Sequence, residues 1–172
     1  MGRLLLCICL IIISSSASAQ YNVKKMMEEG RRSLDAGYYL VAMQFFDRIV
    51  ALKPELYEAW WLLGKAKYHL ADYDGAEHDC SKAILLNPYI ADIYDLRAMV
   101  RIREEKYDSA AIDYTTAIEI QPDNPSYWFN RAVCYYRGGN RQLAITQLDY
   151  IIGRWRSFKE AVTFRRRLLA FQ

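Results

Sequence analysis

The sequence predicts an all-α solenoid in which helical hairpins stack one on another. Three residue types recur at intervals of 34 residues: prolines at Pro54, Pro88 and Pro122, alanines at Ala42, Ala76, Ala110 and Ala144, and tyrosines at Tyr39, Tyr73 and Tyr107. A fixed period of this length is typical of repeat architectures, in which each repeat is one supersecondary unit. Such a unit buries its apolar face only by stacking on its neighbours.

Residues 1–19 stand outside the repeat and are predicted to be a secretory signal peptide. A basic start, an uninterrupted apolar run over residues 4–13 and a string of small residues follow one another. Ala17 and Ala19 form the A-x-A pattern that signal peptidase accepts, which predicts cleavage before Gln20. Ten apolar residues are too few to cross the roughly 30 Å hydrocarbon core, so an uncleaved anchor is not expected.

The predicted leader implies an exported protein. We expect the periplasm or cell envelope of a bacterium, with the extracellular space as the alternative. The chain has no Asn-x-Ser/Thr acceptor, since Asn124 is followed by proline, and this weakly favours a bacterial protein. Cleavage would leave two cysteines, Cys80 and Cys134. Both are expected to be free thiols, because stacked repeats would hold them beyond the ~7 Å Cα limit for a disulfide.

The rest of the chain divides into a lead-in, four blocks and a final helix. Each block is expected to hold a first helix, a turn and a second helix, which a proline ends because it cannot continue the hydrogen-bond ladder. The predicted ranges are 20–22 for the lead-in, 23–56, 57–90, 91–124 and 125–158 for the blocks, and 159–172 for a capping helix.

The second block shows both helices most clearly. Its first helix is predicted by the spacing i, i+3, i+4, i+7, which places side chains on one helix face. The residues with this spacing are Trp60, Leu63, Gly64 and Lys67. Residues 71–74 then predict a turn, with Asp74 as the N-cap of the second helix. Pro88 predicts the end of that helix.

The last part of the array carries its own start and stop signals. Asn124 and Pro125 predict a helix start, as N-cap and first-turn residue, and residues 138–140 predict the turn of the fourth block. Ser157 and Glu160, three residues apart, predict a capping box before the final helix, whose face would hold Ala161, Phe164, Leu168 and Phe171. A polar outer face on this helix would close the stack.

Two further columns, that is, equivalent positions in the successive blocks, predict close packing between the helices of a block. The eighth position is always small: Gly30, Gly64, Ala98 and Ala132. The twenty-fourth is mostly large: Phe46, Cys80, Tyr114 and Leu148. Cys80 is therefore expected to be a small core hydrophobe.

These columns resemble the tetratricopeptide repeat (TPR) family. The second block matches its pattern best, with Trp60, Leu63, Gly64, Tyr73, Ala76, Ala83 and Pro88. The first block has Met26 where an aromatic residue is usual, and the third and fourth have Arg97-Ala98 and Arg131-Ala132 in place of Leu-Gly. The resemblance implies a right-handed superhelix of four hairpins and a cap, with an inner groove lined by the first helix of each hairpin.

The resemblance also implies which side chains line that groove. The candidate partner-binding residues are Trp61, Lys65, Tyr68, His69, Met99, Arg103, Phe129, Tyr136 and Arg137. Aromatic residues and arginine dominate the energetics of protein interfaces. We therefore expect a non-catalytic adaptor or scaffold that binds a protein or peptide. Alternatively, Tyr68 and Tyr136 pack against the second helix of their own hairpins.

One specialised binding mode of the family is not supported by the residues. TPR domains that clamp a peptide's terminal carboxylate use lysine, arginine and asparagine at set positions. Asn130 matches one asparagine, but Asp95 and Met99 stand where lysine and asparagine would be required, and Glu160 where a lysine would be.

Catalytic and cofactor signals are missing from the sequence. There is no glycine-rich phosphate loop and no nucleophile elbow, and the only histidines are His69 and His78, without a ligand spacing. A net charge of +3 gives no reason to expect nucleic acid. We expect no enzyme activity, metal, cofactor or small-molecule substrate.

Charge is concentrated at the end of the chain. Residues 154–172 hold six basic residues and one acid, including Arg165, Arg166 and Arg167. One interpretation is the polar outer face of a cap. The alternative function is that of an envelope protein whose basic final helix contacts anionic lipid or an acidic partner, without spanning the membrane.

Overall fold

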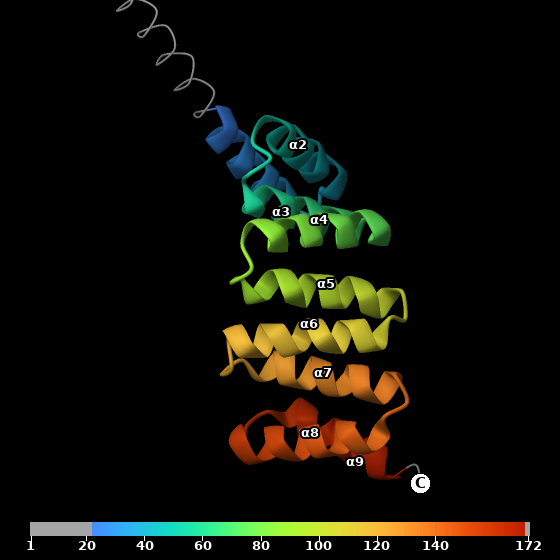
Figure 1. Cartoon of the computed structure of the whole chain (residues 1–172). Coiled ribbons are helices and arrows are strands. Elements are labelled where there is room, and N and C mark those ends of the chain that lie inside the picture. Colours follow the sequence, from blue (N-terminus) through green and yellow to red (C-terminus); the bar gives the residue numbers. More distant parts are fainter. Residues whose placement is uncertain (1–21, 171–172) are drawn as a thin grey trace, which may run out of the picture.

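A computed structural model describes residues 22–170, and regular structure in this range is helical throughout (Figure 1). After a helix over residues 22–35 come α2 (Tyr39–Leu52), α3 (Tyr57–His69), α4 (Tyr73–Leu86), α5 (Ala91–Arg103), α6 (Tyr107–Ile120), α7 (Pro125–Arg137), α8 (Arg141–Arg154) and α9 (Lys159–Ala170). The predicted leader of residues 1–19 and Phe171 lie outside the described residues.

The helices stack along one long axis in chain order, as Figure 1 shows. From α2 to α9 each helix packs on the next, and α3 also contacts α5. Buried side chains form successive clusters along this axis rather than one central core, for example Phe46 with Leu63, Tyr114 with Cys134, and Leu148 with Ala161. The predicted all-α solenoid is therefore confirmed.

The small eighth position lets the two helices of a hairpin approach closely. A Cβ added to Gly64 would lie 3.2 Å from the Cys80 Sγ and from the Ala76 carbonyl oxygen. At Gly30 it would lie 2.7 Å from the Phe46 ring. Cys80 is fully buried, which confirms its prediction as a core residue.

In the second, third and fourth blocks, an aromatic residue at the fourth position connects the hairpin to the loop before it. The indole N–H of Trp60 donates to the carbonyl of Pro54, at 2.8 Å. Tyr94 and Trp128 repeat this bond to Pro88 and Pro122, at 3.2 and 2.9 Å. Proline thus does more than end the second helix, since its carbonyl also orients the next hairpin.

Each turn inside a hairpin passes through one residue with positive φ. These residues stand 34 apart: Gly37, Ala71, Glu105 and Gly139, with φ of 79°, 61°, 60° and 88°. Only two of them are glycines, the residue that adopts this conformation without steric cost. The backbone of the turn is therefore repeated more strictly than its sequence.

The caps agree with the predictions at some helix starts and correct them at others. Asn124 accepts from the Ser126 N–H, with Pro125 in the first turn, as predicted. At α4 the N-cap is Asp72, whose side chain accepts from the Gly75 N–H, so the prediction of Asp74 was wrong by two residues. The last helix begins at Lys159, one residue later than Ser157 as N-cap would require.

A buried polar position recurs on the second helices. Asp79, Asp113 and Gln147, again 34 residues apart, are buried. Lys67 Nζ lies 2.7 Å from the Asp79 carboxylate. Each side chain of this column meets a basic residue on the first helix of its own hairpin.

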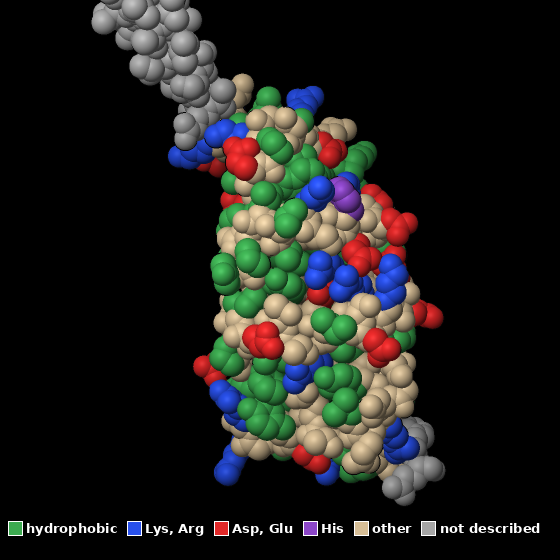
Figure 2. Space-filling view, in the orientation of Figure 1, with side chains coloured by type: hydrophobic (Ala, Val, Ile, Leu, Met, Phe, Trp, Pro, Cys, Tyr) green, Lys and Arg blue, Asp and Glu red, His purple; other side chains and the backbone are tan. Residues whose placement is uncertain are grey.

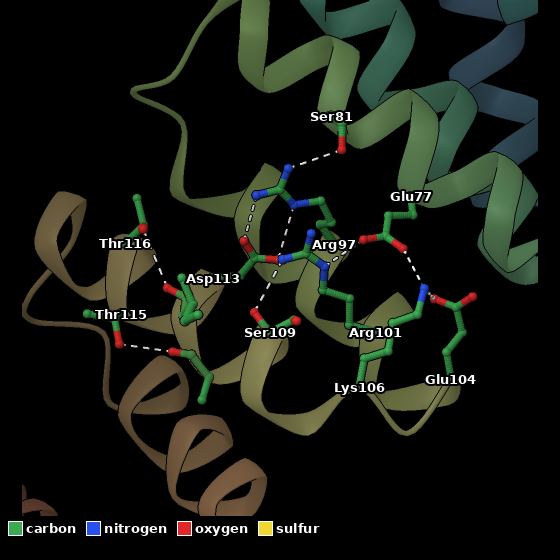
Figure 3. A network of polar contacts seen from close by, with 12 residues as sticks. Glu77, Ser81, Arg97, Arg101, Glu104, Lys106, Ser109, Asp113, Thr115 and Thr116 are labelled. Atoms are coloured by element: carbon green, nitrogen blue, oxygen red, sulfur yellow. Dashed lines mark hydrogen bonds and ion pairs between the residues drawn. The ribbon is translucent and has the colours of Figure 1, made fainter.

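Arginine links three helices in the centre of the stack (Figure 3). Arg97 on α5 donates to both carboxylate oxygens of Asp113 on α6, at 2.7 and 3.1 Å, and to Ser81 on α4 at 3.1 Å. Arg101 donates to Asp113 at 2.9 Å and to Glu77 on α4 at 2.7 Å. Arginine in place of the usual leucine therefore ties neighbouring hairpins together.

The next hairpin repeats this arrangement with a neutral acceptor. Arg131 on α7 donates to the amide oxygen of Gln147 on α8, at 2.8 and 3.0 Å. Its remaining nitrogen donates to Thr115 on α6, at 3.0 Å. Thr115 stands 34 residues after Ser81, so the same slot is used in both hairpins.

Candidate partner-binding face

The nine predicted groove residues all lie on first helices of hairpins, and we call them the candidate face. They are Trp61, Lys65, Tyr68 and His69 on α3, Met99 and Arg103 on α5, and Phe129, Tyr136 and Arg137 on α7. His69, Arg103, Tyr136 and Arg137 are exposed, whereas the other five are half-buried. The structure divides the set into two groups with different surroundings.

In the first group, rings from neighbouring hairpins stack on one another. His69 lies parallel to Tyr39 of α2, with ring centroids 4.3 Å apart, and meets Tyr68 edge-on at 5.5 Å. Arg103 sits over the Tyr68 ring and donates to its hydroxyl at 3.2 Å. Burial, and then the charge of Lys65, lower the pKa of His69, so the neutral ring is favoured.

Trp61 and Met99 contribute mainly to packing. Trp61 packs against buried clusters on both sides of α3, and Met99 packs against the cluster around Cys80. Tyr68 meets Tyr73 of its own hairpin at 6.0 Å, in line with the alternative of packing on the second helix.

In the second group, rings of α7 meet rings of α9. Phe129 contacts Phe158 and Phe164 edge-on, at 5.6 and 5.8 Å. Tyr136 contacts Phe164 at 5.6 Å with the ring planes nearly perpendicular. Tyr136 therefore packs on the final helix.

A cavity of about 330 Å³ opens between α7, the start of α8 and α9. Its lining residues are Val133, Tyr136, Arg137, Arg141, Phe164, Arg167 and Leu168. We call it the α9 cavity. The Arg141 guanidinium donates to the carbonyl of Leu168, which fastens the start of α8 to the end of α9.

The three consecutive arginines of α9 point to different surroundings. Arg165 pairs with Asp149 of α8. Arg166 borders a separate hollow with Val162 and Leu169. Arg167 lines the α9 cavity. Successive helix residues point about 100° apart, so the run does not form one basic patch.

The buried titratable groups are part of the packing. Burial raises the pKa of the Cys134 thiol to about 12 and that of Cys80 further, and both cysteines are free, as predicted. Burial also raises the pKa of Asp95. Among residues 22–170, no three His, Cys, Asp or Glu side chains gather as metal ligands would.

Charged and apolar groups are mixed over the surface. On the face shown in Figure 2, Lys and Arg side chains gather beside acidic ones at the level of α5. In the part of the chain that the structure describes, no helix has the length and apolarity of a membrane span.

Comparisons of the sequence identify two stretches of repeats. Residues 57–89 match the family described as tetratricopeptide repeat, and residues 100–139 match the TPR repeat. The chain is 24% identical over 107 residues to the DnaJ homolog subfamily C member 7 homolog of Dictyostelium discoideum, and 28% identical over 109 residues to the BBSome complex member BBS4 of Mus musculus. These matches cover 60% and 63% of the chain but about a fifth of those relatives.

Comparisons of the structure identify the same fold. MamA of Desulfovibrio magneticus RS-1 superimposes with a TM-score of 0.74 at 17% identity, covering 91% of this chain and 94% of that one. The second TPR domain of human RPAP3, in complex with an HSP70 peptide, gives a TM-score of 0.64 at 21% identity over 67% of this chain and 97% of that one. Two stretches of the chain thus match TPR models, and the described residues fold as an α-solenoid.

Two parts of the site were missed by sequence reasoning. Arg141 lies on a second helix, outside the columns assigned to the groove, and only the structure places it beside Arg137 and Arg167. The network of Arg97 and Arg101 around Asp113 had a signal that could have found it, since Asp79 and Asp113 stand one repeat apart.

Proposed function

We propose that the chain is a non-catalytic, exported adaptor that binds a partner protein or peptide along the candidate face. The observation that carries the proposal is the composition of this face, where aromatic rings and exposed cations come from three successive first helices. Such side chains supply large contact areas and charge-assisted hydrogen bonds, and they are the usual hot spots of interfaces.

The structural neighbours support a peptide-binding role. TPR domains of RPAP3 and of Spaghetti (RPAP3) hold peptides of HSP70 and HSP90. At 21% and 22% identity to this chain, these structures support a shared fold but do not identify the binding residues. The choice of residues rests on the side-chain geometry of this chain.

Site-specific photo-crosslinking tests the binding face. A benzoylphenylalanine placed at Arg103, on the candidate face, should yield discrete adducts in cells that produce the protein. The matched control is Ile112 on α6, which is 66% exposed and lies on a second helix. Equal adducts from both positions, or adducts from Ile112 alone, would contradict the proposed face.

Export is tested separately, by the mass of the protein recovered from its cells. The predicted product begins at Gln20, and Ala17→Phe with Ala19→Phe should leave the leader attached because signal peptidase accepts small residues there. Recovery of the parent chain with residues 1–19 intact would overturn the export part of the proposal.

A further inference from the structure

We propose that the α9 cavity binds a partner segment that carries a carboxylate next to an apolar side chain. This inference rests on the proposed function, because it assigns the partner's chemistry and the end of the candidate face that recognises it. Three observations carry it: the size of the cavity, its arginines, which form no ion pair with a carboxylate of residues 22–170, and its apolar lining.

The cavity is large enough for a peptide side chain. Its volume of about 330 Å³ falls at the lower end of ligand pockets. A second hollow of about 340 Å³ adjoins it, because the two share Phe164 and Arg167, and Phe129 lines that second hollow. A short segment could therefore place neighbouring side chains in both hollows.

The charge of the cavity is entirely positive. Arg137, Arg141 and Arg167 line it, together with four uncharged residues. No carboxylate of residues 22–170 forms an ion pair with any of the three, whereas Arg165 on the same helix pairs with Asp149. Over residues 125–170 the chain has nine basic and two acidic residues, so this end of the stack attracts anions.

The arrangement of groups favours a peptide carboxylate over other anions. A guanidinium presents two parallel N–H groups that match a carboxylate. The lining also includes the apolar side chain of Val133 and the rings of Tyr136 and Phe164, which suit an aliphatic or aromatic neighbour.

Selection of phage-displayed random peptides on the purified full chain tests the inference. Recovered peptides should be enriched in aspartate or glutamate beside a large apolar residue. Measured by fluorescence anisotropy, Arg137→Gln and Arg167→Gln should each weaken their binding at least tenfold, the range expected for a hydrogen bond to a charged group. Arg166→Gln removes the same charge from the neighbouring position and should change binding less than twofold.

The outcomes separate this inference from the proposed function. Peptides that bind without acidic residues, or equally well to the Arg137→Gln and Arg167→Gln variants, would overturn the cavity assignment and leave partner binding intact. If no peptide is recovered and position 103 yields no adducts, both fail. Phosphatidylserine-containing vesicles that bind only when Arg137 and Arg167 are present, with no peptide recovered, would assign the cavity to a lipid headgroup and overturn the peptide.

Discussion

The central hairpin of α5 and α6 and the terminal unit of α7, α8 and α9 share one use of arginine and differ in another. In the centre, Arg97 and Arg101 are engaged by Asp113, Glu77 and Ser81. In the terminal unit Arg131 occupies the slot equivalent to Arg97, but Arg137 and Arg167 have no carboxylate partner among the described residues.

Within one repeat scaffold, arginines that have a buried acceptor stabilise the stack, whereas arginines that have none among residues 22–170 are the ones we assign to binding. A guanidinium between hairpins stabilises the stack only where an acceptor stands on the second helix. Where the final helix supplies Phe164 and Arg167 instead, the same scaffold leaves a cavity whose positive charge is available to a partner. The predictions below test the two roles in order of expected effect.

The largest effect is expected for Asp113→Ala. This change leaves the half-buried Arg97 and Arg101 guanidiniums without their shared, fully buried carboxylate. Removing one partner of a buried ion pair costs about 3–5 kcal/mol, so the free energy of unfolding in urea should fall by about 3 kcal/mol. Glu119→Ala, an exposed change on the same helix, should stay within about 0.5 kcal/mol. Equal effects would show that the central network does not stabilise the stack.

Phe164→Ala should have the second largest effect. The ring contacts Phe129 and Tyr136 and is half-buried, so its loss should cost about 2 kcal/mol, less than for a fully buried phenylalanine. Amide hydrogen exchange should accelerate in α9 and leave α5 unchanged. Thr163→Ala, at the exposed neighbouring position, serves as the control. Unchanged exchange in α9 would mean that the ring contacts do not hold this helix.

Gln147→Ala should cost less than Asp113→Ala. It removes the acceptor of two hydrogen bonds from Arg131, while the bond from Arg131 to Thr115 remains. Loss of such an acceptor costs about 1–2 kcal/mol, measurable by urea denaturation against the exposed control Gln142→Ala. A cost equal to that of Asp113→Ala would show that the neutral acceptor Gln147 stabilises the stack as much as the charged acceptor Asp113.

The smallest effect is expected from the pH dependence of Glu77. Burial opposes it, but hydrogen bonds from Arg101 and Lys106 lower the pKa of Glu77 below its ordinary value of 4.5. A carboxyl with a lowered pKa in the folded state stabilises the fold above its unfolded pKa, and this contribution is lost as the pH falls through the folded pKa. Because the pair is partly exposed, the loss should be about 0.5 kcal/mol.

Urea denaturation of the parent chain and of Glu77→Gln measures the contribution of the ionised Glu77 side chain to the free energy of unfolding. The stability advantage of the parent over the variant should be constant above pH 5 and shrink below pH 4.5. A constant difference across this range would show that the Glu77 pairs contribute nothing that depends on its charge.

Most of the fold was predictable from the sequence because the same residue pattern, and with it the same local structure, recurs in each repeat. The 34-residue columns predicted the helices and the close contact at Gly64, and local chemistry at Asn124 and Pro125 predicted a helix start. The N-cap at α4 was misplaced because Asp72 and Asp74 are chemically equal candidates in one turn. Only the backbone path decides which of them reaches the Gly75 N–H.

Less of the candidate site could be predicted, because its key contacts are made outside the repeat. The repeat positions place Tyr136 and Arg137 on a first helix, but they do not reveal that Phe164 contacts Tyr136. Arg165 and Arg167 look equivalent in the sequence, yet one is paired and the other lines the cavity. Their difference arises from how α9 docks on α7 and α8, which is a tertiary property.

The most direct test of the account is a map of amide chemical shifts in the ¹⁵N-labelled chain on addition of a peptide recovered by the selection above. The account predicts that the largest changes fall in α7 and α9, around Arg137 and Arg167, and that the second helices α4 and α6 change little. Largest changes on α4 or α6, with α7 and α9 unaffected, would contradict it.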